Sequence, residues 1–230
     1  MGSYRADLAR VYREALGFHA VNCAPGILAL LAPLRGGTVL ELGCGTGLLT
    51  RHLVDAGYRV IATDASEDML EHARAHVPEA DVRPLRLPDD PLPRADAVVS
   101  IGNVLNYLTD ADAVVAALEA ASRAVRPGGI LAVDLCDLAW GEAHRNASAK
   151  ARLGDGWAMI TRFAVPRADR FLFDFTIFTE CGDFWRRDDE RHELVLVDAA
   201  EVAARTGLAI GRAFGTETLP AGMVALTNPA

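Results

Sequence analysis

The feature that most constrains the fold is residues 39–47, where a short apolar run ends in Glu41 and glycines then stand at every second position. Residues 48–54 follow at once with the apolar spacing of a helix. Glycine tolerates a positive φ and lets a ligand approach the main chain, and a helix N-terminus offers unpaired N–H groups. The stretch therefore predicts a strand, a tight turn and a helix start that bind a nucleotide-type cofactor on a doubly wound sheet.

The spacing of the glycines excludes two other cofactor loops. A dinucleotide loop follows G-x-G-x-x-G, whereas Gly43, Gly45 and Gly47 are each separated by a single residue. A phosphate-binding Walker loop needs Gly-Lys-Ser/Thr after its glycines, and no such triplet follows. From the loop alone a strand-to-helix turn without a ligand stays open, because turn glycines are common.

The stretch resembles motif I of the class I S-adenosylmethionine (SAM) dependent methyltransferases, in which an acid is followed by x-Gly-x-Gly-x-Gly. Three later segments resemble that family in the same order. They are a second strand ending in Asp64 (59–64), a fourth strand (96–103) and a Pro-Gly-Gly turn into the fifth strand (126–134). Four ordered matches are far more specific than any one of them alone. The resemblance is to the small-molecule type of this family, with an antiparallel lid insert after strand five.

The resemblance implies an α/β, Rossmann-like fold with a doubly wound, seven-stranded, mostly parallel sheet. The patterns predict strands at 38–42, 59–63, 80–85, 95–100, 130–135, 208–214 and 223–227. They predict helices at 3–17, 25–32, 48–56, 67–75, 110–125 and 198–207, the second opened by Pro25. Alternation with period two over 156–165, 170–180 and 184–197 predicts a three-stranded antiparallel β lid insert.

We expect three parts: an N-terminal helical segment over the cofactor site (1–37), a SAM-binding Rossmann-like domain (38–137 and 198–230) and a lid or substrate insert (138–197). The middle lid strand places Phe171, Phe173, Phe175 and Ile177 on one face. Such an apolar face must be covered by the main sheet, the substrate or a second chain. The chain is therefore expected to be a monomer or a homodimer through the lid.

Charge and apolar content restrict the partners and the compartment. Acidic residues outnumber basic ones by 31 to 23, which argues against nucleic acid, since that partner selects basic surfaces. No apolar run reaches the roughly 18 residues of a membrane span, and no signal peptide is recognised, so no membrane partner is expected. The four cysteines lack paired C-x-x-C spacing, which favours reduced thiols and a cytoplasmic protein.

The resemblance places the methionine end of SAM on the glycine loop and the ribose at Asp64, whose carboxylate can accept hydrogen bonds from two hydroxyls. The family usually offers an acid to the adenine amino group after the third strand. Here Asp81 comes too early and Asp89 late, so backbone groups near 85–87 are expected to replace it. The expected cofactor contacts are Tyr12, Glu41, Gly43, Cys44, Gly45, Gly47, Asp64, Ala65, Met69, Leu85, Leu87, Ser100, Ile101 and Gly102. For Tyr12 and Met69 the alternative is that the side chain only packs in or beside the core.

Methyl transfer requires a well-placed nucleophile in a water-free site, and a hydroxyl acceptor also requires a base. The candidate catalytic residues are His192, His144 and Asn103, each of which also reads as a packing, surface or capping residue. Asp134 and Asp137 could begin a metal site, but two carboxylates without a third ligand do not define one, and no metal is expected. The expected substrate contacts are Tyr4, Asn106, Tyr107, Trp140 and Phe175.

Two nucleobase chemistries are excluded by missing motifs. Residues 100–103 read Ser-Ile-Gly-Asn where an Asp/Asn-Pro-Pro-Tyr/Phe motif would serve exocyclic amines, and no Pro-Cys nucleophile follows the fourth strand. The sequence thus predicts a SAM-dependent methyltransferase that N- or O-methylates a small, natural-product-type molecule and releases S-adenosylhomocysteine. Two alternatives stay open: a SAM enzyme that does not methylate, such as a cyclase or lyase, and a non-catalytic SAM-binding protein.

Overall fold

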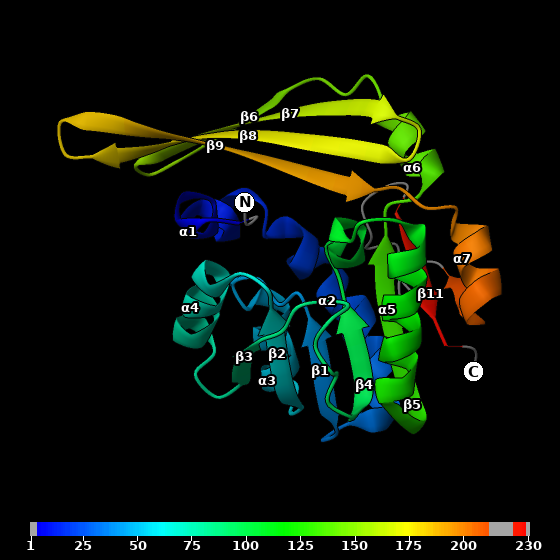
Figure 1. The fold of residues 1–230 in the computed structure, drawn as a ribbon. Helices are drawn as coiled ribbons and strands as arrows, with labels where there is room; N and C mark the ends of the chain where they lie inside the picture. Colours follow the sequence, from blue (N-terminus) through cyan, green and yellow to red (C-terminus); the bar gives the residue numbers. More distant parts are fainter. Residues whose placement is uncertain (1–3, 212–222, 229–230) are drawn as a thin grey trace.

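The computed structural model describes residues 4–211 and 223–228. Its body is a seven-stranded sheet in the order β10-β11-β5-β4-β1-β2-β3 (Figure 1). Five strands run parallel to their neighbours, with a register shift between β4 and β5, while β11 runs antiparallel to β5 and β10 antiparallel to β11. This confirms the predicted Rossmann-like class. The strands are β1 (Thr38–Leu42), β2 (Arg59–Asp64), β3 (Asp81–Pro84), β4 (Ala95–Ser100), β5 (Val125–Leu135), β10 (Ala209–Gly211) and β11 (Val224–Thr227).

Helices cover both faces of the body sheet because its central strands are apolar on both sides. On β1, Leu40 packs in one core cluster with Leu118, whereas its neighbour Val39 packs in another with Ile27. Two helices contribute side chains to the first cluster, α5 (Ala111–Ala124) and α7 (Ala199–Thr206). Three contribute to the second, α2 (Phe18–Leu31), α3 (Leu48–Asp55) and α4 (Glu67–His76). The remaining helical elements are α1 (Ala6–Ala15), η1 (Ala32–Leu34), η2 (Val104–Tyr107) and α6 (Leu138–Ala143).

A second, antiparallel sheet of four strands lies across the carboxyl end of the body sheet, with α1 between the two (Figure 1). Its order is β6 (Lys150–Gly154), β7 (Trp157–Arg167), β8 (Arg170–Cys181) and β9 (Phe184–Val195). The lid insert predicted after strand five is therefore present, but the prediction of three strands is wrong by one. All residues of β6 are exposed, so no alternation of buried and exposed positions marks it in the sequence.

The apolar face of the lid is covered by the chain itself. Phe175 and Ile177 pack with Leu8 and Val11 of α1. Phe171, which is fully buried, packs beside Trp140 of α6 with ring centroids 4.6 Å apart. The sequence suggested the main sheet, the substrate or a second chain as the cover, whereas α1 and α6 of the same chain cover this face here. The β8–β9 hairpin extends beyond the body (Figure 1).

The N-terminal helices differ from the prediction at one boundary. The second helix was expected to open at Pro25, yet α2 begins at Phe18 and contains Pro25. A proline inside a helix leaves the carbonyl four residues earlier without its N–H partner. That carbonyl belongs to Val21, which is half exposed, so water can satisfy it. Packing of Cys23 and Ile27 in the core then holds the helix together across the proline.

Most other boundaries agree with the sequence patterns to within a few residues. The strand expected at 208–214 is described over Ala209–Gly211, and residues 212–214 lie outside the described residues. In the described ranges no single helix is long and apolar enough to cross a bilayer. The pair Ala6–Ala15 and Phe18–Leu34 meets that length and composition only when joined across a 61° bend.

Candidate active site

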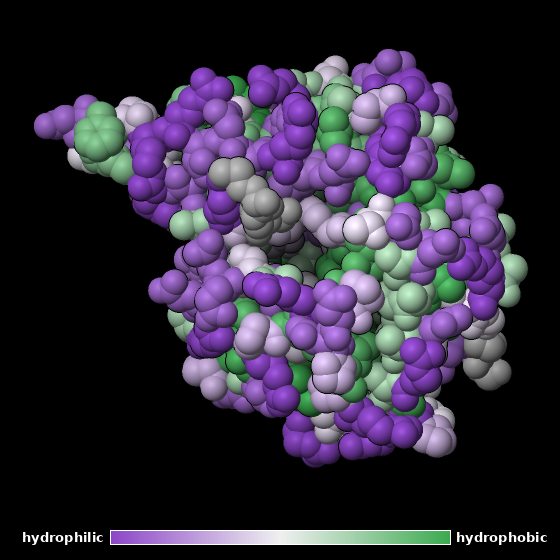
Figure 2. All heavy atoms as spheres, in the orientation of Figure 1, coloured by the Kyte–Doolittle hydropathy of each residue, from purple (hydrophilic) through white to green (hydrophobic). Residues whose placement is uncertain are grey.

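A cavity of about 650 Å³ opens where the carboxyl ends of β1, β2 and β4 meet the N-terminal segment. This is within the usual range of small-molecule pockets. Figure 2 shows the hollow between the body and the lid sheet. The expected site residues that line the cavity are Tyr4, Tyr12, Gly43, Gly45, Asp64, Ala65, Met69, Leu85, Leu87, Ile101, Gly102 and Tyr107.

The glycine loop takes a backbone course that other residues would resist. Gly43, Gly45 and Gly47 all have positive φ, at 72°, 53° and 81°. A Cβ on Gly43 would also lie 2.3 Å from a methyl carbon of Val104. The Cys44 N–H donates to the carbonyl of Thr63 at 2.8 Å, which ties the turn to the end of β2. Glycine is therefore required here both for conformation and for space.

The Glu41 side chain does not line the cavity and instead supports the glycine loop. Its side chain is buried, and the Thr50 hydroxyl donates to Oε2 at 2.7 Å. Burial raises the pKa of Glu41 to about 8, although the hydrogen bond from Thr50 opposes that shift. Cys44, Gly47 and Ser100 also lie outside the lining. These four positions shape the loop and the strand ends that carry it.

Asp64 presents its carboxylate to the cavity from the end of β2. Its two oxygens accept backbone hydrogen bonds from Gly45 and Ser66, each at 2.9 Å. Burial raises the pKa of Asp64, and these backbone donors oppose the shift. Each carboxylate oxygen can accept a further bond, so the group remains able to receive hydroxyl donors from a ligand.

Met69, Leu85 and Leu87 contribute apolar side chains to the cavity lining, and we refer to these three residues as the apolar slot. The Leu85 N–H already donates to the Asp64 carbonyl at 3.0 Å, and the Arg86 N–H to a carboxylate oxygen of Asp90 at 2.7 Å. These two backbone donors are thus paired within the chain. A ring bound in the slot would find apolar contacts on its faces and carbonyl groups or the Leu87 backbone at its edge.

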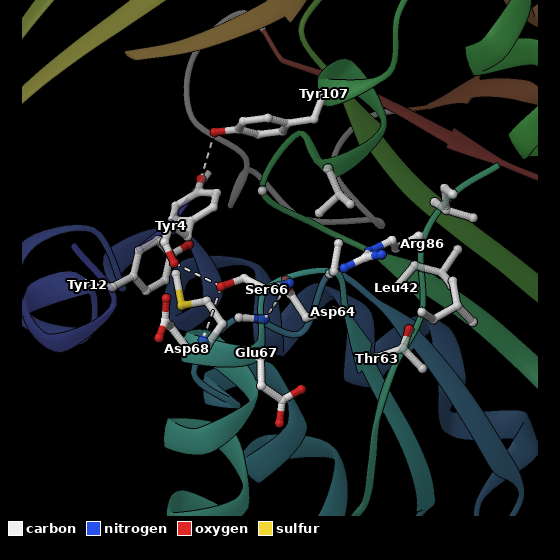
Figure 3. Close-up of a pocket in the computed structure, with 18 of the residues that line it drawn as sticks. Tyr4, Tyr12, Leu42, Thr63, Asp64, Ser66, Glu67, Asp68, Arg86 and Tyr107 are labelled. Atoms are coloured by element: carbon white, nitrogen blue, oxygen red, sulfur yellow. Dashed lines mark hydrogen bonds between the residues drawn. The ribbon is translucent and has the colours of Figure 1, made fainter. Parts of the chain in front are cut away.

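Three tyrosines form one wall of the cavity. The hydroxyls of Tyr4 and Tyr107 lie 2.8 Å apart, and the Tyr12 ring meets the Tyr4 ring edge to face at 5.6 Å (Figure 3). Tyr4 has a left-handed φ of 58°, which is strained for a bulky residue. The Ser66 hydroxyl donates to its carbonyl at 2.8 Å, and its N–H donates to Glu190 at 2.9 Å. Contacts from the body and the lid together therefore hold Tyr4 over the cavity.

His192 lies directly behind this wall and does not line the cavity. Its Nδ1 is 2.9 Å from the Tyr107 hydroxyl, and its Nε2 is 2.9 Å from a carboxylate oxygen of Glu190. The Arg5 N–H donates to the other Glu190 oxygen at 2.9 Å. Burial raises the pKa of Glu190, but hydrogen bonds from His192 and the Arg5 backbone outweigh it and leave the pKa below its usual value. Sequence reasoning missed Glu190, although an acid among the inward positions of a lid strand was a usable signal.

Two of the remaining candidates are used elsewhere in the fold. Asn106 is fully buried, and its amide pairs with the backbone of Cys136 and Val195 through three hydrogen bonds of 2.6–2.9 Å. The expectation that it contacts substrate is wrong, because it joins the end of β5 to the lid. His144 stacks on Trp140 with centroids 4.3 Å apart and bonds the Trp140 carbonyl at 2.8 Å, outside the cavity lining. Trp140 and Phe175, the other expected substrate contacts, also lie outside it.

A buried ion pair that the sequence did not reveal fixes the segment after β4. Asp134 accepts hydrogen bonds from the backbone of Gly102 and Asn103, both at 2.8 Å, and from His19 Nε2 at 2.7 Å. Burial lowers the pKa of His19, but the hydrogen bond and charge of Asp134 dominate and raise it to about 10. The Asn103 side chain lies outside the cavity lining. No sequence pattern linked a histidine at position 19 to a carboxylate at position 134.

The two carboxylates considered for a metal are occupied by the protein. Asp134 holds the segment after β4, and Asp137 accepts the Trp140 N–H at 2.7 Å as the N-cap of α6. Within the described residues no group of three or more histidine, cysteine or acidic side chains is placed to hold a metal ion. Both side chains therefore have structural partners where they stand.

Comparisons with known proteins agree with this architecture. Residues 39–129 match a methyltransferase domain family. The chain is 37% identical over 112 residues to the cypemycin N-terminal methyltransferase of Streptomyces sp, covering 46% of this chain and 44% of that protein. It is 36% identical over 169 residues to the malonyl-[acyl-carrier protein] O-methyltransferase of Pectobacterium atrosepticum, covering 74% and 59%. The chain thus spans about half the length of these curated relatives.

The fold is similar to solved structures over almost its whole length. Streptomyces venezuelae DesVI superposes with a TM-score of 0.76 at 23% identity, covering 99% of this chain and 100% of that one. A SAM-dependent methyltransferase from Clostridium acetobutylicum gives a TM-score of 0.81 at 17% identity, with 96% of each chain covered. The fold and the cavity define a Rossmann-like cofactor-binding domain. The chain belongs to the class I SAM-dependent methyltransferase family, in which SAM is the methyl donor.

The cavity has the chemistry that SAM requires. The open space over Gly45, where a Cβ would meet only the Tyr12 ring at 3.7 Å, leaves the loop backbone accessible to the methionine part. Asp64 can accept ribose hydroxyls, and the slot of Met69, Leu85 and Leu87 offers apolar contacts to adenine. Aromatic rings and carboxylates around the cavity favour a positively charged sulfonium. These residues fit the cofactor of the family.

Proposed function

We propose that this chain transfers a methyl group from SAM to a nitrogen or oxygen atom of a small, natural-product-type molecule. The observation that carries the proposal is that Gly43, Asp64, Tyr4 and Tyr107 all line the same cavity. The glycine loop and Asp64 hold the cofactor there, and the tyrosines face the remaining space. SAM brings an activated methyl group, so the chain has to orient the acceptor and exclude water.

The size of the cavity supports a small acceptor. Its 650 Å³ would have to hold both cofactor and acceptor, and the lid sheet with α1 closes it on one side. A polymer would need an open groove with a basic surface, whereas this chain carries a net charge of −8. The names of two relatives point to the N-terminus of cypemycin and to a malonyl-[acyl-carrier protein] as acceptors. A small molecule is the acceptor that a cavity of this size favours.

Calorimetry with SAM tests the cofactor site. The wild-type chain is expected to bind SAM, and Asp64→Ala to weaken binding by about 10- to 100-fold, because it removes a charged acceptor of ribose hydroxyls. Asp55→Ala is the matched control, since this exposed carboxylate pairs with Arg51 on α3 away from the cavity. Equal affinity in wild type and Asp64→Ala would show that the ribose is placed wrongly.

A mass-spectrometric screen tests the reaction. Purified chain, SAM and a library of small amines and hydroxyl compounds should yield a product heavier by one methylene together with S-adenosylhomocysteine. Turnover without S-adenosylhomocysteine would instead favour a cyclase or lyase. SAM binding with no turnover against the library would favour a non-catalytic SAM-binding protein. The three readings are thus separated by one set of measurements.

We also propose that any homodimer forms through the outer part of the lid. Phe184 and Trp185 at the tip of the β8–β9 hairpin are 64% and 53% exposed, while the inner lid face is covered by α1 and α6. Light scattering coupled to size-exclusion chromatography measures the oligomeric state. If the wild type is dimeric, Trp185→Ser should make it monomeric. A dimer that survives this substitution would have to use another surface.

A further inference from the structure

Four polar side chains form a continuous line from the cavity into the interior of the lid. Tyr4 and Tyr107 line the cavity, and their hydroxyls are 2.8 Å apart. The Tyr107 hydroxyl is 2.9 Å from His192 Nδ1, and His192 Nε2 is 2.9 Å from Glu190. Every link is within hydrogen-bonding distance. The four residues come from the N-terminal segment, η2 and β9, so three separate elements converge to build the line.

The hydrogen bonds in this line run in one direction. A carboxylate only accepts, so Nε2 of His192 carries the hydrogen toward Glu190 and Nδ1 is left as an acceptor. Tyr107 then donates to Nδ1 and accepts from Tyr4. The Tyr4 oxygen keeps a lone pair that can accept a hydrogen from a molecule in the cavity. Figure 3 shows the first of these contacts, between Tyr4 and Tyr107.

The tyrosines are suited to pass a proton but not to hold a negative charge. Burial raises the pKa of Tyr107 far above its usual value, and burial together with the neighbouring Tyr107 does the same for Tyr4. Both hydroxyls therefore stay protonated at neutral pH. His192 has an ionised acceptor beside it in Glu190, which also receives the Tyr4 and Arg5 N–H groups. The rings packed against that of His192 belong to Tyr4, Tyr107 and Phe175, and none of them carries a charge at neutral pH.

We infer that Tyr4, Tyr107, His192 and Glu190 form a proton relay that takes the proton of the methyl acceptor out of the cavity. This inference rests on the proposed methyl transfer. The acceptor atom forms a bond to the methyl carbon while the carbon–sulfur bond breaks, its electron pair passing to sulfur. The acceptor's N–H or O–H proton moves to the Tyr4 oxygen, the Tyr4 proton moves to Tyr107, and the Tyr107 proton moves to His192 Nδ1.

The resulting imidazolium is stabilised by Glu190, and the relay is reset when the same steps run backwards to water after the product leaves. Tyr4 is the catalytic residue of the relay, since it faces the acceptor. Tyr107 passes the proton, and Glu190 is a positioning residue that acts through His192. The acceptor class that such a relay serves is an amine or alcohol that loses a proton on methylation, as opposed to a thioether or tertiary amine.

A nuclear magnetic resonance experiment tests the relay without any acceptor. Protein labelled with ¹⁵N at its six histidines is saturated with S-adenosylhomocysteine, and His192→Gln identifies the resonances of His192. The relay requires hydrogen on Nε2, which faces Glu190, and none on Nδ1, which faces the Tyr107 hydroxyl. Tyr107→Phe should shift the Nδ1 resonance and leave the Nε2–H in place. Hydrogen on Nδ1, or a doubly protonated ring, would overturn the relay, because Nδ1 could then accept no proton.

Turnover of the compound found in the methylation screen gives the second readout. Tyr107→Phe should lower kcat by about 100-fold, as expected for loss of proton transfer, with SAM affinity unchanged. Its solvent isotope effect on kcat should also differ from that of wild type. Tyr58→Phe is the matched control, because it removes a buried tyrosine hydroxyl that donates to the Leu31 carbonyl at 2.7 Å far from the cavity.

A kcat for Tyr107→Phe equal to that of Tyr58→Phe would overturn the relay, and so would a loss of SAM binding in Tyr107→Phe. The proposed function fails in a different way. If no compound is methylated but the resonance pattern of His192 is as expected, the methyltransferase assignment is in doubt while the hydrogen-bonded line stands. If a compound is methylated and His192 is protonated on Nδ1, the enzyme stands and the relay does not.

Discussion

The two ends of the cavity are held in place by different kinds of interaction. At the cofactor end, the turn 43–47 depends on backbone conformation, and its partners Thr63 and Asp64 lie about twenty residues away in the chain. At the end that we propose for the acceptor, Tyr4 contacts Tyr107, 103 residues away in the chain, and the Tyr4 N–H donates to Glu190, 186 residues away. A site made of local backbone geometry leaves a compact pattern in the sequence. A site made of side chains from distant segments leaves none until the chain is folded.

Of the substitutions that test this difference between the two ends, the one at Gly43 is expected to have the largest effect. Gly43→Ala puts a Cβ into a left-handed backbone and 2.3 Å from Val104, so we expect a loss of about 3 kcal/mol in the free energy of unfolding and loss of SAM binding. Gly36→Ala is the control: its φ of 80° is similar, but no atom lies within 4 Å of the added Cβ. That variant should lose about 1 kcal/mol. Urea unfolding of both variants checks the difference, and equal losses would refute the packing part of the argument.

A pH series on His19→Gln examines the ion pair under the segment after β4. The folded pKa of His19 is about 10 against an ordinary value of 6.5. The stabilisation it gives is therefore complete below pH 6.5 and is lost as the pH rises through 10. Between these limits the difference in unfolding free energy between wild type and His19→Gln should shrink by about 3 kcal/mol. A difference that stays constant with pH would mean that His19 is not charged in the folded chain.

Ser66→Ala is expected to have the smallest effect, and it touches both ends of the cavity. Ser66 accepts the Met69 N–H as the N-cap of α4 and donates to the Tyr4 carbonyl. Its loss should cost about 1 kcal/mol of stability, like that of the exposed N-cap Asp110 on α5. The acceptor KM should rise in Ser66→Ala and not in Asp110→Ala, because only Ser66 also holds Tyr4. Equal KM values would show that Tyr4 keeps its place without the serine.

The sheet was predictable because its signals are local. β1 and β4 were predicted at their observed bounds, since each is a short, largely apolar segment between turn residues. The start of α2 was not, because tertiary packing of Cys23 and Ile27 overrides the preference of Pro25 for a first turn. β6 was not predicted because an exposed edge strand shows no alternation of apolar and polar residues.

The candidate site was predictable in part for the same reason. Asp64 and Gly45 stand at strand and loop positions that the family pattern marks, and both line the cavity. Asn106 was misjudged because a polar residue near a strand end looks the same whether it faces a ligand or pairs with buried backbone. His192 was singled out on residue type alone. Its partners became visible only when β9 was placed against η2.

The wall formed by Tyr4 and Tyr107 is only one side chain thick. Within the described residues no strand of the lid lines the cavity, although the His192 ring lies 4.6 Å from that of Tyr4 and 5.6 Å from that of Tyr107. A small residue at either tyrosine would join the cavity to the space beside His192. Under the proposed function, a single substitution at either position would therefore change the size of acceptor that fits, while the glycine loop stays as it is.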